Sequence, residues 1–316
     1  LAMIVDRNQK VKEFVKEKYY VAHLTFGEFD AVSGHFQKKE EADKVASDCK
    51  ERMCQVEKED VQTKIMRAPK LYDLTSLQRD ANRIFGFTAK QTLEYTQSLY
   101  EKKLVTYPRT DSQYLSDDME ETAKAVIGAV YQAILFEEQT GAEPDIKRVL
   151  NSKKVTDHHA VIPTRNLQGA DLTGLPVGEK AVLELVALRL LCAVAQPYTF
   201  AETAVVVECA GAEFTAKGRT VKQPGWRALD AAYRAGLKNA EPETEDKALP
   251  ELSEGQTLPL SGAAVKEGKT TPPKHFTEDT LLSAMETAGK EDMPEDAERK
   301  GLGTPATRAG ILEKLV

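Results

Sequence analysis

The chain has 316 residues, 41% of them hydrophobic, and a formal net charge of -7. This length suits two or three domains with real cores, and no apolar run reaches the about 18 residues that a membrane span needs. The N-terminus also lacks the basic and apolar segments of a signal peptide. The net negative charge argues mildly against a protein that only coats nucleic acid.

The cysteines and the two ends of the chain set further limits. Cys49, Cys54, Cys192 and Cys209 show no C-x-x-C spacing, so neither a zinc ribbon nor a disulfide framework is indicated, and a reducing compartment fits best. The chain opens without an initiator methionine and closes inside a helical pattern. We therefore expect an excised fragment, with sequence missing at both ends.

The first 70 residues predict a small sheet with one surface helix. A short mixed helix is expected over 10–17, followed by a hairpin of the strands Tyr19–Phe26 and Phe29–Phe36. Lys38–Met53 is highly charged with a thin apolar stripe, which is typical of a surface helix. Cys54–Met66 alternates enough to be a strand.

Two capped helices are predicted next. Thr75–Gln78 offers a capping box for a first helix that ends at Gly86, and Thr88–Gln91 offers another for a helix that runs to about Lys102. An extended segment, Leu104–Arg109, follows. Two helices joined by a tight glycine turn resemble a helix-turn-helix unit, although such pairs are also common in plain helical bundles.

The next part of the chain begins with helices and returns to strands. Ser116 is expected to cap a helix that ends near Phe136, and Val177–Gln196 predicts a largely buried helix. Glu202–Ala216 predicts two strands around Gly211.

Pro224–Trp226 predicts a turn, Lys238–Ala248 a charged linker, and Gln256–Lys266 one or two short strands. Thr277 is expected to cap a helix over Leu281–Met285. Two sheet-rich sections thus flank a helical insert at about 71–165, whose two boundaries must lie close together, as in a hinged clamp.

The sharpest chemical motif is Tyr107-Pro108-Arg109. Proline biases Tyr107 toward extended geometry, and residues two apart in an extended segment project to the same face. The phenol and the guanidinium would then address one target, because a cation favours the phenolate and binds phosphate bidentately. The same tripeptide also occurs in ordinary loops, with the tyrosine at a core edge and the arginine in solvent.

Two other motifs carry groups that could interact with phosphate. One motif places Asp157 next to His158 and His159, directly before an apolar stretch that is expected to be buried. The two histidines could orient a proton donor toward phosphate. The loop Gly301–Gly310, with Arg308 near a helix start, suits a phosphate backbone, although a tight structural turn explains it as well.

Taken together, five motifs in this order resemble those of type IA DNA topoisomerases, most closely the bacterial topoisomerase III branch. They are LTSLQRDA at 74–81, LVTYPRTDS at 104–112, DHHAVIPT at 157–164, PPKHFT at 272–277 with TLLSAM at 280–285, and GLGTPATRA at 301–309. The resemblance spans essentially the whole chain.

The resemblance implies roles for the residues in these motifs. Tyr107 matches the nucleophile that attacks a single-stranded DNA phosphodiester, forming a 5′-phosphotyrosine and releasing a 3′-hydroxyl. Arg109 matches a residue that contacts phosphate beside it, and His158 matches a histidine near the scissile phosphate. The further candidates for DNA contact are Gln78, Ser112, His159 and Arg308, of which Gln78 and Arg308 are equally candidates for structural contacts.

The implied fold is α+β and multidomain. Residues 16–70 and 166–272 would form a β-rich arch, and 71–165 a helical, winged-helix-like domain that carries Tyr107. Residues 1–15 and 273–316 would belong to a helical DNA-gripping domain. The hinge between arch and nucleophile domain would open a gate for another strand.

The chain also departs from the family pattern, because it contains no Asp-x-Asp and no acidic cluster like the Toprim magnesium site. We expect the Mg²⁺ ligands in a missing Toprim domain, no metal in this chain, and no relaxation or religation by the chain alone. Single-stranded DNA is the expected partner, with a helicase as a further partner of the whole enzyme. The expected state is a monomer in the bacterial cytoplasm, without a membrane.

Two alternatives stay open. In the first, the chain grips single-stranded DNA without catalysis, and Tyr107 is a stacking or core aromatic residue. In the second, the chain is a rolling-circle nickase, which typically uses a His-apolar-His metal pair. His158 and His159 are adjacent, which argues against the nickase.

Overall fold

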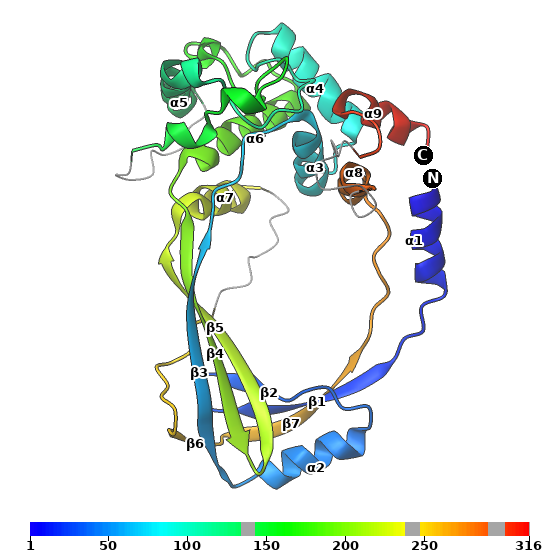
Figure 1. The fold of residues 1–316 in the computed structure, drawn as a ribbon, viewed down its shortest axis with the longest axis vertical. Coiled ribbons are helices and arrows are strands. Elements are labelled where there is room, and N and C mark those ends of the chain that lie inside the picture. Colours follow the sequence, from blue (N-terminus) through cyan, green and yellow to red (C-terminus); the bar gives the residue numbers. More distant parts are fainter. Residues whose placement is uncertain (134–142, 238–246, 290–300, 316) are drawn as a thin grey trace.

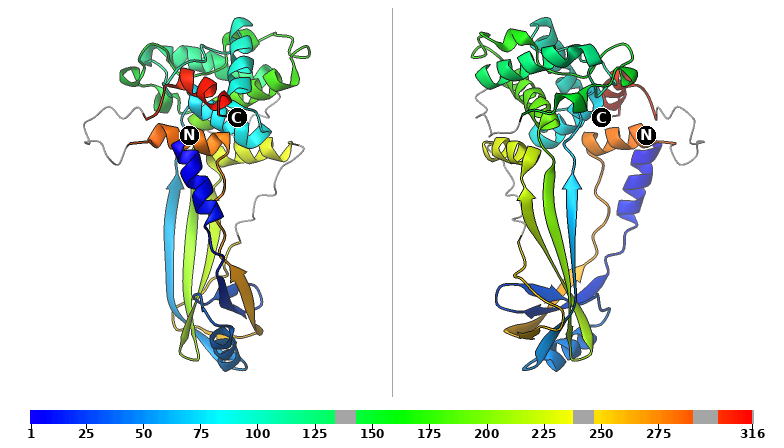
Figure 2. Two further views of the ribbon diagram at one scale, coloured as in Figure 1. Left: turned by 90° about the vertical axis from the view of Figure 1, so that its right-hand side faces the viewer. Right: turned by 60° about the vertical axis from the view of Figure 1, so that its left-hand side comes forward.

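The computed structural model describes residues 1–133, 143–237, 247–289 and 301–315. Helices gather at one end of the molecule and a sheet tip forms the other, so that the chain has a ring-like outline (Figure 1). One side of the ring is a long β-ribbon, and the other consists of an N-terminal helix and the segment that returns from the sheet. Both termini lie on this second side, close to each other (Figures 1 and 2).

The first of the two ends, which we call the helical head, has one core. Its helices are α3 (Leu74–Phe85), α4 (Ala89–Glu101), α5 (Glu120–Ala133), α6 (Val177–Val194) and α7 (Gly225–Ala235). Leu77, Leu99, Val126 and Leu190 are buried in a single cluster. Helix α6 is mostly apolar, and most of its residues are buried among the other helices.

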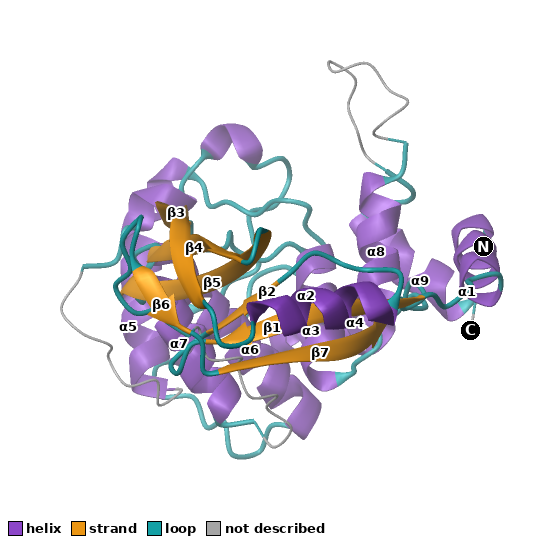
Figure 3. Ribbon diagram, turned by 90° about the horizontal axis from the view of Figure 1, so that it is seen from below, coloured by secondary structure: helices purple, strands orange, loops and turns teal. Residues whose placement is uncertain are grey.

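Within the described ranges, seven strands pair in one antiparallel sheet with the order β6-β3-β4-β5-β2-β1-β7. They are β1 (Lys18–Thr25), β2 (Asp30–Val32), β3 (Met53–Met66), β4 (Tyr198–Cys209), β5 (Ala212–Gln223), β6 (Thr257–Pro259) and β7 (Gly262–Lys269). The three long strands β3, β4 and β5 make the ribbon that carries the head. Helix α2 (Lys39–Cys49) lies across β1 and β7 at the far end (Figure 3).

This sheet tip has a core of its own, which joins one face of β1 to α2. Ala22 and Leu24 on β1 pack with Ala46 and Cys49 on α2 and with Phe214 on β5. The alternation of β1 thus buries Ala22 and Leu24 on the face that meets the helix.

A third cluster joins the two ends of the chain to the head. Helices α8 (Glu278–Thr287) and α9 (Pro305–Glu313) bury Leu282 and Leu312 against Ala89 of α4. Helix α1 (Ala2–Lys12) adds the half-buried Ile4 to this cluster. Helices α1, α8 and α9 therefore form one body next to the helical head.

Many elements expected from the sequence are confirmed. The hairpin of β1 and β2, helix α2, strand β3, the buried helix α6 and the strands around Gly211 all form. Thr88 and Gln91 make the predicted capping box of α4, and Thr277 caps α8. Gly86 ends α3 with a φ of 72°, a left-handed conformation that favours glycine.

Three local predictions are wrong. Helix α1 occupies Ala2–Lys12 rather than 10–17. The cap of α3 is Asp73 paired with Ser76, not Thr75 with Gln78, because Asp73 already accepts the Ser76 N–H. Pro224–Trp226 begins helix α7 instead of forming an isolated turn, since Gly225 with a φ of 48° packs its backbone directly on Gln196 and Pro197.

The cores also divide the chain differently from the expected boundary at residue 166. Helix α6 and Leu229 of α7 lie within 166–272, the expected second part of the arch, yet they pack in the core of the head with Leu71 and Leu77. The long ribbon therefore meets the head at Met66 and Tyr198, which pair with each other.

Some predictions fall partly on residues outside the described ranges. The helix expected after Ser116 begins with a short 3-10 turn at Asp117–Met119 and continues as α5, whereas its predicted end beyond 133 is not described. Most of the expected linker Lys238–Ala248 is likewise outside the described part. None of the described helices is long and apolar enough to cross a membrane.

Candidate active site

Tyr107 lies on a segment that is fastened to the stretch from Ala160 to Pro163. Val105 bridges to Pro163, and the Thr106 N–H donates to the Ile162 carbonyl at 2.9 Å. The Thr106 hydroxyl donates to the Ala160 carbonyl and accepts the Ile162 N–H, each at 3.0 Å. The residue before the phenol is thereby locked on both its backbone and its side chain.

The segment bends directly after Tyr107. The Thr110 N–H donates to the Pro108 carbonyl at 3.0 Å, which turns the chain at Pro108 and Arg109. The expectation of extended geometry through Arg109 is therefore wrong. Strand alternation does not set the direction of the guanidinium; this tight turn does.

The hydroxyls of Thr110 and Ser112 hold the bend against the segment that carries His158. The Thr110 hydroxyl donates to the His158 carbonyl at 2.9 Å and accepts the Ser112 N–H at 3.1 Å. The Ser112 hydroxyl donates to the Lys154 carbonyl at 2.8 Å. Thr110 and Ser112 are both buried, so these bonds are shielded from water and fix the two segments together.

Two rings flank the phenol. The imidazole of His158 lies with its centroid 4.2 Å from that of Tyr107, and the ring of Tyr100 on α4 meets Tyr107 edge-on at 5.5 Å. Tyr107 is half-buried and His158 is exposed. The aromatic contacts thus hold the Tyr107 ring at the surface beside a titratable imidazole.

Arg109 is exposed beside this pair. Its Nη1 donates to the Gln97 side-chain oxygen on α4 at 2.6 Å. Arg109 and His158 line one cleft of about 170 Å³, whose far wall is Thr304–Ala306 at the start of α9. The structure therefore gathers Tyr107, Arg109 and His158 at one place and brings the beginning of α9 to the same place.

The remaining predicted residues lie elsewhere or inside the protein. Gln78 is fully buried, donating from Nε2 to the Ala89 carbonyl at 2.9 Å, while its side-chain oxygen is buried without a hydrogen-bond partner. Arg308 is buried and bonds to the Leu302 carbonyl and the Thr75 hydroxyl. These placements give Gln78 and Arg308 structural contacts. Ser112 likewise faces inward, and half-buried His159 contacts the Ala160 carbonyl.

The carboxylates nearest the phenol do not make a metal site on their own. Asp111 and Asp157 line the same cleft as His158, but Asp111 accepts a hydrogen bond from the Thr156 hydroxyl at 3.2 Å. Across the described ranges, no three His, Cys, Asp or Glu side chains converge as metal ligands. The residues around Tyr107 therefore do not fit a complete Mg²⁺ site.

Sequence reasoning missed Thr106 and Thr110, which anchor the site. The signal was present, since a threonine precedes Tyr107 and another follows Arg109 in Thr-Tyr-Pro-Arg-Thr. Threonine hydroxyls readily bond to nearby backbone, but their partners at 158–162 are distant in the sequence. Tyr100 was also missed, because it falls inside the predicted helix that runs to about Lys102 and nothing in that pattern marks it as a neighbour of Tyr107.

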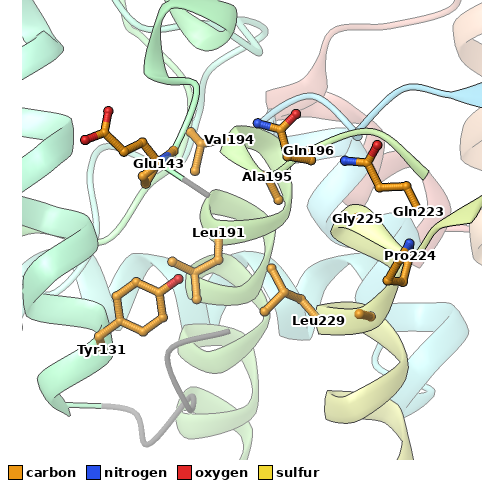
Figure 4. Close-up of a pocket in the computed structure, with 12 residues that line it drawn as sticks. Tyr131, Glu143, Leu191, Val194, Ala195, Gln196, Gln223, Pro224, Gly225 and Leu229 are labelled. Atoms are coloured by element: carbon orange, nitrogen blue, oxygen red, sulfur yellow. The ribbon is translucent and has the colours of Figure 1, made fainter. Parts of the chain in front are cut away.

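A larger pocket of about 270 Å³ lies away from this site, where α6 and α7 meet the ribbon. Figure 4 shows Leu191 and Leu229 facing it across from Tyr131, with the Gln196 and Gln223 amides at its rim. None of the predicted site residues lines it.

Comparisons with known proteins agree with the motifs. A family model described as DNA topoisomerase matches residues 1–316. DNA topoisomerase 3 of Bacillus licheniformis is 42% identical over 261 residues, covering 78% of this chain and 35% of the relative. DNA topoisomerase 3 of Shouchella clausii is 35% identical over 338 residues, covering 100% of this chain and 45% of the relative.

A solved structure shows the same fold at greater sequence distance. The full-length topoisomerase I of Thermotoga maritima matches with a TM-score of 0.74 and 22% identity, covering 100% of this chain and 49% of that one. The chain thus spans between about a third and a half of the length of the relatives it matches. On the family match over its whole length and on these identities, the chain belongs to the DNA topoisomerase family, as a type IA, topoisomerase III-like member.

Proposed function

We propose that this chain supplies the strand-cleaving half of a type IA DNA topoisomerase, with Tyr107 as the nucleophile. The observation that carries the proposal is the grouping of Tyr107, His158 and Arg109 at one surface, with the two rings 4.2 Å apart. A phenol has an ordinary pKa of about 10, so it needs neighbouring cations or hydrogen-bond donors to attack at neutral pH.

The proposed reaction exchanges one phosphodiester for another. The Tyr107 oxygen attacks the phosphorus of a single DNA strand, the bond from phosphorus to the 3′-oxygen breaks, and the tyrosine proton leaves to solvent or a neighbouring base. The products are a 5′-phosphotyrosine and a free 3′-hydroxyl, which takes up a proton. Reversal reseals the strand, so no external energy source is needed.

Arg109 and His158 have distinct proposed roles. The Arg109 guanidinium holds a non-bridging phosphate oxygen and offsets the charge that develops during attack. It reaches this position by leaving Gln97, its present neutral partner. His158 lies against the phenol ring and donates a hydrogen bond to the phosphate when its imidazole is protonated.

Mg²⁺ belongs to the proposal only as a property of the whole enzyme. When bound, the ion would neutralise phosphate charge, and its ligands would come from an acidic Toprim domain. The residues that the structure describes do not form that site, and we infer that the isolated chain neither relaxes supercoiled DNA nor religates it.

The proposed domain roles follow the ring-like outline. The ribbon and sheet tip act as an arch that lifts the winged-helix-like nucleophile domain, and α1, α8 and α9 belong to a DNA-gripping domain. Opening between them would let a second strand pass, giving relaxation or decatenation. The proposed setting is a monomer in the bacterial cytoplasm that binds single-stranded DNA and works with a helicase.

The test is a covalent-adduct assay on the natural full-length protein. A labelled single-stranded oligonucleotide is incubated with Mg²⁺, the reaction is stopped with denaturant, and labelled protein is measured on a gel. Tyr107→Phe should abolish the adduct and retain DNA binding. Tyr100→Phe, which keeps the neighbouring ring, is the matched control and should retain the adduct.

Unchanged adduct formation by Tyr107→Phe would overturn the nucleophile assignment. DNA binding by the unaltered protein without any adduct would instead favour the noncatalytic binding module.

A further inference from the structure

Two lysines share one aromatic ring a few residues beyond the nucleophile. The Nζ of Lys154 lies 5.0 Å from the centroid of the Tyr114 ring, and the Nζ of Lys70 lies 5.5 Å from the same centroid. Both lysines are exposed and Tyr114 is half-buried. We call these three side chains the two-lysine platform.

The backbone of the platform is held by the same contacts that hold the active site. The Ser112 hydroxyl donates to the Lys154 carbonyl at 2.8 Å and accepts the Tyr114 N–H at 3.2 Å. The Tyr114 carbonyl accepts the Ala160 N–H at 2.9 Å. Tyr114 and Lys154 are thus tied to the loop of Tyr107 and to the segment that carries His158.

Lys70 comes to the ring from a different direction. It immediately precedes Leu71, which is buried in the head, and its carbonyl accepts a hydrogen bond from Arg189 Nη1 at 3.4 Å. Three separate parts of the chain therefore meet at one ring. The side chains of Lys70 and Lys154 are exposed, whereas the main chain of both residues is anchored by hydrogen bonds.

The charges at the platform are not balanced by the described residues. Neither Lys70 nor Lys154 makes a salt bridge to any described carboxylate. The carboxylates of two nearby loop residues have other partners, because Asp111 binds the Thr156 hydroxyl and Asp117 accepts the Ser152 N–H. Two ammonium groups near one ring repel each other, and the ring face offsets only part of this repulsion.

We propose that the two-lysine platform is a binding site for the phosphate backbone of a single DNA strand, next to the strand's cleavage point at Tyr107. The phosphate groups of a strand would neutralise the two ammonium charges. A nucleic-acid strand fits better than a free anion, because two exposed lysines from separate parts of the chain can each hold a phosphate of the same backbone. This inference rests on the proposed function and assigns a path to its substrate.

The experiment measures binding of a fluorescein-labelled single-stranded oligonucleotide to the 316-residue chain by anisotropy over a range of salt concentrations. For single strands, each phosphate contact adds about 0.7 to the slope of log K against log salt. The double variant Lys70→Gln, Lys154→Gln should therefore lower that slope by about 1.4. Lys153→Gln, an exposed lysine next to Lys154 that does not lie over the ring, should leave it close to the original value.

The role of the ring is tested separately. Tyr114→Leu should weaken binding, whereas Tyr114→Phe, which keeps the ring, should restore it. A circular dichroism melt for each variant establishes that the chain is folded.

Three results would overturn the proposal: no binding by the unaltered chain at low salt, an unchanged slope in the double variant, or an equal loss in Lys153→Gln. Inorganic phosphate gives one further outcome. If it displaces the oligonucleotide at the same concentration at which it protects Lys70 and Lys154 from acetylation, the site is a free-anion site and the proposal is overturned. Absence of the Tyr107 adduct from the unaltered full-length protein would count against the proposed function, not against the platform.

Discussion

The Thr110 hydroxyl donates a hydrogen bond to the His158 carbonyl at 2.9 Å, which joins the loop of the proposed nucleophile to the histidine that contacts its ring. Thr110 is only 3% exposed, so a side chain without a hydroxyl would leave the Ser112 N–H and the carbonyl without this partner. The position of the imidazole beside Tyr107 thus depends on a residue that is itself almost completely buried.

Thr110→Val should destabilise the chain by about 1–3 kcal/mol, the usual cost of leaving buried polar groups unpaired. It should also lower adduct formation in the full-length protein, because His158 loses its anchor. Thr110→Ser keeps the hydroxyl and should restore most of the adduct. Urea unfolding and the adduct assay measure the two effects, and equal adduct yields for the valine and serine variants would show that Thr110 has no positioning role.

Arg109→Lys should lower the adduct yield even though it keeps the positive charge. A planar guanidinium binds phosphate through two parallel hydrogen bonds and an ammonium group cannot. One charge-assisted hydrogen bond is worth about 1.5–3 kcal/mol, so the initial rate of adduct formation should fall about tenfold or more. Gln97→Ala is the control, since it removes the present partner of Arg109 without touching phosphate; a rate for Arg109→Lys equal to that of unaltered protein would exclude bidentate binding.

The carboxyl of Asp73, at the start of α3, should make the unfolding free energy depend on pH. Burial raises the pKa of its carboxyl above the ordinary value, although the two hydrogen bonds from Ser76 act in the opposite direction. The folded chain then holds a proton on Asp73 that the unfolded chain releases at lower pH, so the unfolding free energy should fall as pH rises from about 4 through the raised pKa.

Asp73→Asn should remove this part of the pH dependence and keep the cap, whereas Asp73→Ala should lose the cap at a cost of about 0.5–2 kcal/mol. Urea midpoints between pH 4 and pH 7 measure both effects. An unaltered pH profile in Asp73→Asn would mean that another group is responsible.

Buried thiols should make the chain sensitive to alkali. Burial raises the pKa of Cys49 and of Cys192 to about 12, and burial raises that of Cys54 as well. Unfolded thiols lose their protons from about pH 8.5, so the unfolding free energy should fall with rising pH by at most about 1.4 kcal/mol per pH unit for each thiol.

Cys49→Ala should therefore show a shallower decline in its urea midpoint between pH 8 and pH 10 than the unaltered chain. The interval stays at or below the ordinary pKa of tyrosine, about 10, which limits the contribution of Tyr72 and Tyr233. A decline as steep as in the unaltered chain would show that the Cys49 thiol ionises equally in both states.

Local signals predicted most of the helices and strands, and they failed where distant residues decide. The capping box of α4 involves only Thr88 and Gln91, which are three residues apart, and it forms as expected. Pro224–Trp226 has the composition of a turn, yet it starts α7 because the backbone at Gly225 packs on Gln196 and Pro197. That contact links segments about 30 residues apart and leaves no trace in the local pattern.

The candidate site divides in the same way. The motifs, through their resemblance to the family, singled out Tyr107, Arg109 and His158, which the fold brings together. Spacing could not tell that Gln78 and Arg308 are buried, because a polar residue in a motif looks the same whether it bonds to protein or faces solvent. The missed residue Thr110 acts through a carbonyl 48 positions away, a partner that no local pattern specifies.

The pairing of Met66 with Tyr198 has a consequence for how the protein is assembled. These residues are the last of β3 and the first of β4. The chain between them therefore leaves the sheet and returns to it at one point. A short turn joining the two strands would leave a plain hairpin in the sheet. Helices α3 to α6 of the head can thus pack through contacts within this one stretch of chain, whereas the sheet must pair residues as far apart as Lys18 and Lys269. Because distant pairings form slowly, the sheet should close last, after these four helices have packed.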